Sequence, residues 1–584
     1  MKFEELHYPE PYDMQDGYLG YWTYNHKGDA KFNRICNFFP YVELQIIIDD
    51  GVNRRAQVKI GAFYSEGTPL KTLTVSDQQF IAMDWHRAEW GYENNIESNN
   101  VRDKLRHAIQ CTAKHSEKTF IYETTGWKQI DGEWCYLMPG DEAHTVSLSG
   151  RCDSYGMDRS KDITTDDLLN MTGLLYQVAP KEIMFPLIAF AFLSPLNTFL
   201  RKARCELKTI LMLTGKTGAK KSTLAALILS FFGRFSTADL PSSFRDTANS
   251  IVKQGFYLKD VLTCIDDFHP SAGRDEKEMK EKMQTVLRAY GNRTGRGRLN
   301  SKAELMKDCT PQGNAIITAE FLPDVGESGT ARYLCLDLKQ GDVNNAELTK
   351  YQHLDADGML SAVMLRYTEW IKEKHLADEE RFVKGLAAMF ESRRTVIQKR
   401  AEKENVTLRD RLIDDLITLS FGFGFFTDFL KSMEAITSDT VAEMNREFET
   451  ILLTLAKNQQ KKTEEDQPTH VFLKKFFSLL DSDRITLIPK DRPEILGREN
   501  SVGYEDTECF YLDTSLVHRE VRRLCVDQGE SFSITEKGLL SALANEKLLL
   551  KDADGRNTRQ IRIGNTKRRL LVIPKETARR IAEE

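Results

Sequence analysis

A short loop that joins an apolar segment to a Lys-Ser-Thr triplet has the residue types and spacing best suited to chemistry. Residues 209–214 are expected to form a strand, residues 215–223 (Gly-Lys-Thr-Gly-Ala-Lys-Lys-Ser-Thr) form the loop, and the apolar residues 224–232 follow as a helix. Backbone N–H groups in such a loop and at a helix N-terminus favour bound phosphate. The strand–loop–helix order therefore predicts a P-loop that binds a nucleoside triphosphate.

The residue types within this loop predict distinct roles. Lys221 is expected to reach the β- and γ-phosphates of ATP, and the Ser222 hydroxyl to bind Mg2+. Lys220 stands where the pattern G-x-x-x-x-G-K-[ST] has its second glycine, which costs free energy if that position needs a positive φ. The other residues predicted to contact the nucleotide are Gly215, Thr217, Gly218, Ala219 and Thr223. The alternative is an ordinary turn between a strand and a helix.

Two adjacent carboxylates end a second apolar segment, residues 256–268, about 45 positions after the loop lysine. This arrangement is typical of a Walker B motif. Asp266 is predicted to hold Mg2+ through water, and Asp267 to orient or deprotonate the attacking water. The alternative is an Asp-Asp turn after a strand.

Polar residues at two further strand ends extend this pattern. Residues 312–320 form an apolar segment with Thr318 and Glu320 at its end, and either could contact the nucleotide site. A capped strand end is the alternative. Arg332 opens the next apolar strand, where an arginine could reach a neighbouring subunit's nucleotide and stabilise transition-state charge. That role requires an oligomer, whereas a surface salt bridge does not.

Two clusters of basic residues predict contact with DNA phosphates. Residues 290–302 contain three glycines and no acidic residue. Their cations, Arg293, Arg296, Arg298 and Lys302, could neutralise phosphates, act at a subunit interface or remain solvated. Near the end of the chain, a Thr-capped helix at 534–543 and a strand pair around a Gly-bearing turn at 552–555 predict a winged helix. Its wing would contact DNA through Arg556, Arg559, Arg562, Lys567, Arg568 and Arg569, although such a module can also dock proteins.

The elements that position these residues divide the chain into four regions. Residues 1–160 are β-rich with one helix at 101–111, and strands are expected to pair 42–48 with 56–60 and 119–122 with 133–137. Residues 165–345 alternate strands and helices, as in a parallel α/β sheet. Residues 346–460 are helical, the polar stretch 456–466 is expected to be a linker, and 468–584 form the last domain.

Composition narrows the class of protein. The 584 residues are 41% hydrophobic and 29% charged, which is typical of a folded multidomain protein. A net charge of −6 argues against a surface that is basic throughout, but it permits a local basic channel. The ten cysteines contain no CxxC pair, so a zinc ribbon is not expected.

Two apolar features of the sequence predict a cytoplasmic protein without a membrane partner. The first residues have no apolar leader segment. The apolar stretch 183–200 is interrupted by Pro186 and Pro195, which favours a buried helix over a membrane span.

The segment from 125 to 332 resembles the AAA+ MCM-like replication helicases of staphylococcal cassette chromosomes and pathogenicity islands. The matching residues are Thr-Gly-Trp at 125–127, Lys-Ser-Thr at 221–223 and Thr-Ala-Glu at 318–320, whereas Lys220 departs from the P-loop pattern. The resemblance implies an α/β fold: an AAA+ P-loop ATPase core with an α+β N-terminal domain and a C-terminal winged helix.

The resemblance also implies a ring, a hexamer, that hydrolyses ATP with Mg2+ and translocates on single-stranded DNA to replicate a mobile element. Lys221, Ser222, Asp266 and Asp267 would form one half of the nucleotide site, and Arg332 of a neighbour would form the other. Two other functions are compatible with the residues: an origin-binding initiator with little unwinding activity, or an AAA+ remodeller that acts on proteins.

Overall fold

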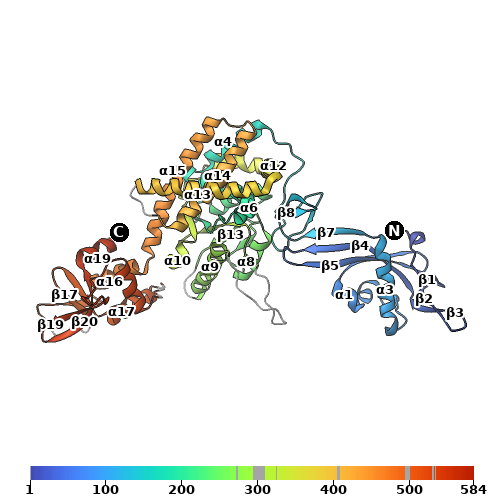
Figure 1. Ribbon diagram of the computed structural model, residues 1–584, viewed down its shortest axis with the longest axis horizontal. Helices are drawn as coiled ribbons and strands as arrows, with labels where there is room; N and C mark the ends of the chain where they lie inside the picture. The colour runs from blue at the N-terminus through green and yellow to red at the C-terminus, as the bar shows by residue number, and fades with distance from the viewer. Residues whose placement is uncertain are drawn as a thin grey trace.

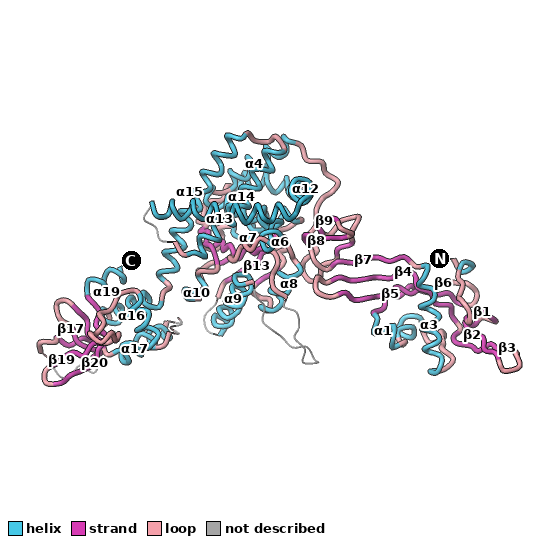
Figure 2. The backbone as a smooth tube through the Cα atoms, in the orientation of Figure 1, coloured by secondary structure: helices cyan, strands magenta, loops and turns pink. Residues whose placement is uncertain are grey.

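The computed structural model describes residues 2–270, 274–293, 309–323, 325–403, 408–492, 500–528, 530, 532 and 534–583. These residues form an elongated molecule with a β-rich N-terminal part, a large central part and a small C-terminal part (Figure 1). The central part carries most of the helices, and they lie on both sides of its sheet (Figure 2).

The N-terminal part contains two sheets. An antiparallel sheet has the order β1-β2-β3, with β1 Tyr12–Gln15, β2 Tyr18–Tyr24 and β3 Ala30–Cys36. A mixed sheet has the order β10-β7-β4-β5-β6, with β4 Phe38–Asp49, β5 Arg54–Tyr64, β6 Pro69–Ser76, β7 Glu117–Tyr122 and β10 Thr145–Val146. The helices are α1 Asp77–Ala82, α2 Trp85–Trp90 and α3 Arg102–Thr112. The expected β4–β5 pair and the helix α3 are confirmed.

The second expected strand pair is wrong. Residues 119–122 lie in β7, which pairs with β4 and β10, whereas 133–137 form β9 (Glu133–Leu137), which pairs with β8 (Gly126–Ile130). The two-residue turn Asp131-Gly132 has positive φ at both positions, 52° and 89°. Such a turn favours a tight local hairpin, so β8 takes the place expected for a more distant partner.

The β8–β9 hairpin packs into the core of the central part, although it falls within the region expected to be N-terminal. Trp127 belongs to the same buried cluster as Phe199. The Trp127 backbone N–H donates to Asp260 Oδ2 over 3.0 Å, and the indole Nε1 donates to the Pro195 carbonyl over 2.7 Å. Gly126 has φ +83°, and a Cβ there would lie 2.5 Å from the Lys259 carbonyl. Only glycine fits this close approach, which accounts for the Thr-Gly-Trp sequence.

A five-stranded parallel sheet of order β12-β13-β14-β11-β15 forms the centre of the molecule. Its strands are β11 Ile210–Thr214, β12 Ser242–Ser243, β13 Leu262–Phe268, β14 Asn314–Ala319 and β15 Tyr333–Asp337. The apolar residues of β11 and β14 are buried throughout, as expected for parallel strands covered on both faces. The adjoining helices are α7 Lys221–Leu229, α8 Ala248–Tyr257, α9 Arg274–Asn292 and α10 Gly326–Thr330. A mixed α/β fold with a parallel sheet is confirmed.

The remaining helices of the central part are α4 Thr165–Val178, α5 Lys181–Leu193, α6 Asn197–Lys202, α11 Asn345–Ala356, α12 Met359–His375, α13 Glu379–Lys403, α14 Asp410–Ser432 and α15 Ser438–Glu465. The helical stretch Lys181–Lys202 is apolar and long enough to cross a membrane, but its apolar window is entirely buried inside the protein. The linker expected at 456–466 is instead the end of α15, because Gln459 and Thr463 are buried against the central part.

The C-terminal part has its own core, built on Phe472, Phe476 and Leu512 among others. Its elements are α16 Pro468–Asp481, β16 Thr486–Pro489, β17 Ser501–Glu505, β18 Cys509–Leu512, α17 Thr514–Asp527, α18 Glu536–Asn545, β19 Arg559–Ile563, β20 Thr566–Pro574 and α19 Lys575–Glu583. The sheet order is β16-β17-β18-β20-β19. The expected Thr-capped helix is confirmed as α18, whose Thr535 side chain accepts from the Gly538 N–H.

Candidate functional site

The glycine-bearing loop lies between the buried strand β11 and helix α7, as the sequence predicts. A Cβ on Gly215 would lie 2.2 Å from the Leu338 carbonyl, so the first loop position is restricted to glycine by space. Lys220 has φ 67° and ψ 30°, the left-handed conformation that favours glycine. Its Nζ contacts Asn345 Oδ1 at the start of α11. The loop therefore needs a positive φ at Lys220, which costs free energy for a residue other than glycine, as the sequence analysis predicts.

Lys221 begins α7 and points back into the loop. Its side chain is largely buried, and Nζ donates to the carbonyl oxygens of Gly215 over 2.7 Å and Lys216 over 3.2 Å. The ammonium thus lies inside the loop, at a helix N-terminus that favours negative charge.

Three motifs that are distant in sequence meet at the Asp266 carboxylate. Oδ1 of Asp266 accepts from the Ser222 hydroxyl over 2.7 Å and from the Thr318 hydroxyl over 2.5 Å. The Thr318 hydroxyl also accepts from the Asp267 backbone N–H over 3.0 Å. An irregularity in the β13–β14 pairing between Ile265 and Phe268 accompanies this turn of the chain. The loop, the Asp-Asp pair and the β14 strand end therefore form one polar cluster.

Asp267 has a different environment from its neighbour. Its backbone is left-handed, with φ 64°, a conformation that Asp tolerates better than most residues. Its side chain is half exposed, and Arg245 Nη2 lies 3.8 Å from Oδ2. The carboxylate is therefore accessible from solvent beside the part-buried Asp266 cluster, and Arg245 is a neighbour that the motifs did not predict.

Glu320 contacts the loop rather than Asp266. It accepts from the Thr217 hydroxyl, and its Oε2 lies 2.8 Å from Nδ1 of His269. The hydrogen bond from Thr217, together with the charges of His269 and Lys221, lowers the pKa of Glu320. The two candidates thus have different neighbours: Thr318 contacts the paired aspartates and Glu320 contacts the loop, and both remain predicted site residues. His269 was missed, and its position directly after the Asp-Asp-Phe sequence is the only signal that could have indicated it.

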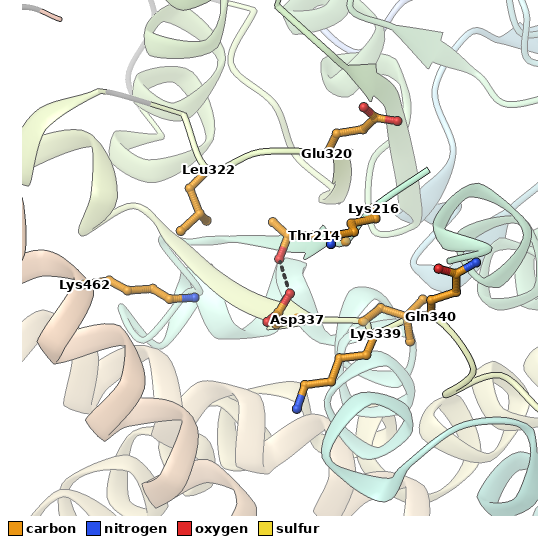
Figure 3. Close-up of a pocket in the computed structure, with 10 residues that line it drawn as sticks. Thr214, Lys216, Glu320, Leu322, Asp337, Lys339, Gln340 and Lys462 are labelled. Atoms are coloured by element: carbon orange, nitrogen blue, oxygen red, sulfur yellow. Dashed lines mark hydrogen bonds between the residues drawn. The ribbon is translucent and has the colours of Figure 1, made fainter. Parts of the chain in front are cut away.

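A cavity of about 550 Å³ opens beside the first residues of the loop (Figure 3). Its lining includes Thr214, Lys216, Glu320, Asp337, Lys339 and Lys462. Lys462 extends into it from α15 (Figure 3). The volume is within the range of small-molecule sites.

Arg332 lies at the end of the parallel strands opposite to the end that carries the loop. The Ile210 N–H at the start of β11 donates to the Arg332 carbonyl over 3.0 Å, whereas Lys221 follows the end of β11. At 3.3 Å per residue, the two ends of β11 are separated by about 15–20 Å along the strand. Arg332 therefore cannot contact a phosphate bound at its own loop.

The environment of the Arg332 guanidinium is cationic. Its Nε donates to Asn292 Oδ1 over 3.2 Å and its Nη1 to the Ser328 hydroxyl over 2.6 Å. Burial, followed by the charges of Arg411 and Arg288, lowers the pKa of Arg332. Among the described residues Arg332 forms no ion pair, so the salt-bridge alternative finds no support in this part of the chain.

The structure corrects the prediction that Arg293 contacts DNA. Its guanidinium donates to the carbonyl oxygens of Pro311 over 2.9 Å and Gly313 over 2.7 Å, and to Asn314 Oδ1 over 3.2 Å. Burial lowers the pKa of Arg293 to about 10. Arg293 thus ties the end of α9 to the start of β14. Arg296, Arg298 and Lys302 lie outside the described residues.

The six basic residues predicted for the wing divide into two groups. Arg556 and Arg569 pair with Asp554, and Arg559 donates to the Lys551 carbonyl over 2.7 Å. The other three, Arg562, Lys567 and Arg568, are exposed on β19 and β20, with Arg562 directly opposite Lys567. These three form no ion pair with the described residues, so they are the cations of the predicted wing that are available to an external anion.

Comparisons with known proteins support the fold. A solved structure described as "SCCmec type IV Cch - active helicase" superimposes with a TM-score of 0.60 at 13% identity, covering 99% of this chain and 100% of that chain. A second match, a JCV helicase bound to a small molecule, has a TM-score of 0.20 at 12% identity, covering 44% of this chain and 73% of that chain, which is too poor a superposition to compare folds. No protein-family model and no curated protein matches the sequence. At such low identity, the first match shows a common fold over the whole chain.

Proposed function

We propose that this chain is an ATP-dependent DNA helicase with an AAA+ ATPase core. The observation that carries the proposal is the Asp266 carboxylate, which accepts hydroxyl hydrogen bonds from both Ser222 and Thr318 at the mouth of the loop. This arrangement joins the three parts that nucleotide hydrolysis needs: a phosphate-binding loop, a metal-binding carboxylate and a polar group on an adjacent strand.

The donor set fits Mg2+. Ser222 Oγ and Asp266 Oδ1, 2.7 Å apart, are oxygen ligands of the kind Mg2+ prefers, and phosphates and water would complete the shell. Bound Mg2+ would neutralise charge on the β- and γ-phosphates of ATP. Lys221 would exchange its bonds to loop carbonyls for phosphate oxygens. Asp267, accessible and next to Asp266, would orient the attacking water, with Thr318 and Glu320 fixing the surrounding polar groups.

An oligomer is part of the proposal because of Arg332. It lies too far from its own loop to act there, and it is surrounded by cations rather than by a carboxylate. An anion from a second copy would satisfy this environment, and a nucleotide phosphate is the anion that an arginine finger contacts. A hexameric ring is the assembly implied by the family resemblance.

DNA is the proposed nucleic-acid substrate, on which the protein would translocate. The exposed cations Arg562, Lys567 and Arg568 on the wing, and the basic segment 294–302 in the sequence, would neutralise backbone phosphates. The resemblance to MCM-like helicases and the full-length likeness to a structure described as an SCCmec helicase support replication of a mobile genetic element, which would place the protein in the cytoplasm.

Strand displacement on a forked duplex with ATP and Mg2+ tests the proposal. Wild-type protein is expected to displace the strand, and Lys221→Ala to lose displacement and ATP hydrolysis. Lys384→Ala is a matched control, because Lys384 is exposed on α13 and its ion pair among the described residues is with Glu380, one turn away. DNA-stimulated ATPase without displacement would favour an origin-binding initiator. ATPase that does not respond to DNA would favour a protein remodeller.

A further inference from the structure

The end of helix α15 runs along the outer edge of the central sheet. β15 is the last strand of that sheet in the part of the chain that the structure describes, so its outward backbone groups have no neighbouring strand there. The Gln459 side chain provides part of the missing pairing, because its Oε1 accepts from the Cys335 N–H over 3.2 Å. Its Nε2 donates to the Thr330 carbonyl over 2.8 Å. Gln459 is only 4% exposed, so both ends of this amide are used inside the protein.

A second residue of the same segment holds Thr330 from another side. The Thr330 hydroxyl donates to an Asp466 carboxylate oxygen just after α15. Thr330 is fully buried, and its backbone carbonyl and its hydroxyl are both bound by this segment. Removing one partner would leave a buried polar group unsatisfied, which is costly.

The residues held in this way flank Arg332. Thr330 lies two positions before it and Cys335 three positions after it. Repulsion from Arg288 and Arg411 would move the Arg332 guanidinium if its backbone were free. We propose that Gln459 and Asp466 are positioning residues that hold Arg332 for its action on the nucleotide of a second copy of this chain. This inference rests on the proposed function, in which Arg332 acts between subunits.

The substitution Gln459→Met tests the inference in the full-length protein. Methionine keeps the length of the side chain but removes both hydrogen bonds. We expect kcat for ATP hydrolysis to fall by about tenfold or more, because small misplacement of a catalytic group is costly. Nucleotide affinity should stay within about twofold, because the protein's own loop is intact. The control is Gln460→Met, since the Gln460 amide donates, among the described residues, to Glu464 of the same helix and makes no hydrogen bond to Thr330 or Cys335.

A second pair of variants addresses Asp466. Asp466→Asn keeps an acceptor for the Thr330 hydroxyl and should retain near wild-type kcat, whereas Asp466→Ala should lower it. If Asp466→Ala still has a lower kcat than Asp466→Asn when Thr330 is replaced with valine, the effect of Asp466 does not pass through Thr330. That result would overturn this part of the proposal.

Mixing subunits separates positioning from misfolding. Gln459→Met protein has an intact loop but a displaced arginine, whereas Lys221→Ala protein has a defective loop and a correctly held arginine. Mixed assemblies should therefore recover hydrolysis, and each protein alone should not. Normal kcat of Gln459→Met, or a defect that mixing does not relieve, would overturn the inference. Normal kcat of Arg332→Ala would instead overturn the intersubunit role in the proposed function, so the two failures are distinguishable.

Discussion

The Thr318 hydroxyl donates to the Asp266 carboxylate over 2.5 Å and accepts from the backbone N–H of Asp267 over 3.0 Å. One side chain at the end of β14 thereby fixes both aspartates at the end of β13. The orientation of the proposed metal-binding carboxylate and the backbone of the proposed water-orienting residue consequently depend on a residue of the neighbouring strand.

This relationship predicts a kinetic defect in Thr318→Val. Valine has the same shape but lacks the hydroxyl, so Asp266 loses one donor and the Asp267 N–H loses its acceptor. We expect kcat for ATP hydrolysis to fall by about 10- to 100-fold, with ATP binding largely preserved. Thr318→Ser should restore much of the rate. Equal loss of rate in Thr318→Ser and Thr318→Val would show that the hydroxyl is not the important group.

Arg332→Ala should abolish turnover while ATP binding survives. An arginine finger contributes about 10³-fold or more to the rate of phosphoryl transfer, whereas ground-state binding is supplied by the loop. ATPase assays with a nucleotide-binding measurement check both parts. Mixing with Lys221→Ala subunits should restore hydrolysis, and failure to do so would argue that Arg332 does not act between subunits.

The left-handed backbone at Lys220 predicts a stability change. A non-glycine residue in this region costs about 1 kcal/mol relative to glycine, so Lys220→Gly should raise the free energy of unfolding by up to about that amount. Lys220→Ala retains a Cβ and should give no such gain. Chemical denaturation of the three proteins distinguishes these outcomes, and equal effects of Gly and Ala would show that the backbone conformation is not responsible.

The free energy of unfolding should depend on pH through Asp415 on α14. Burial raises the pKa of this carboxyl to about 7, against the opposing effect of Arg411. The folded state therefore retains a proton that the unfolded chain loses near its ordinary pKa, and this stability is lost as the pH rises toward 7. Asp415→Asn keeps the acceptor for the Lys208 N–H, 3.2 Å from Oδ1 in the wild type. Its thermal midpoint should fall less than that of the wild type between pH 5 and pH 8.

The two groups of wing cations should differ in their effect on DNA binding. Replacing Arg562, Lys567 and Arg568 with alanine should weaken binding and reduce the slope of log K against log salt by about 2. Replacing Arg556 and Arg569 should have a smaller effect, because both already pair with Asp554. Similar slopes for the two variants would argue against the wing as the contact surface.

The sequence predicted those parts of the site that depend on local order. The loop lies between a strand and a helix, and the Asp-Asp pair and Thr318 end buried strands, because a short apolar run before polar residues specifies such ends. The choice between Thr318 and Glu320 could not be made from sequence, because it depends on which side chain faces the neighbouring strand.

Other polar and charged residues were predicted to be exposed but make hydrogen bonds inside the protein. Arg293 belongs to a basic segment, yet its guanidinium satisfies buried carbonyl groups, and only the fold brings those groups together. The polar end of α15 lacks an evident apolar face, but Gln459 and Thr463 are buried through hydrogen bonds. The β8–β9 pairing depends on the local Asp131-Gly132 turn, which favours a hairpin over pairing with the more distant strand.

The docking of the β8–β9 hairpin has a mechanical consequence. The Trp127 N–H is bound to Asp260, which stands two residues before β13, and Asp266 lies near the other end of the same strand. The two aspartates are about 20 Å apart along a strand that cannot lengthen appreciably. A pulling force on the N-terminal part would therefore be transmitted along β13 to the carboxylate that meets Ser222 and Thr318, so the proposed hydrolysis would respond to load.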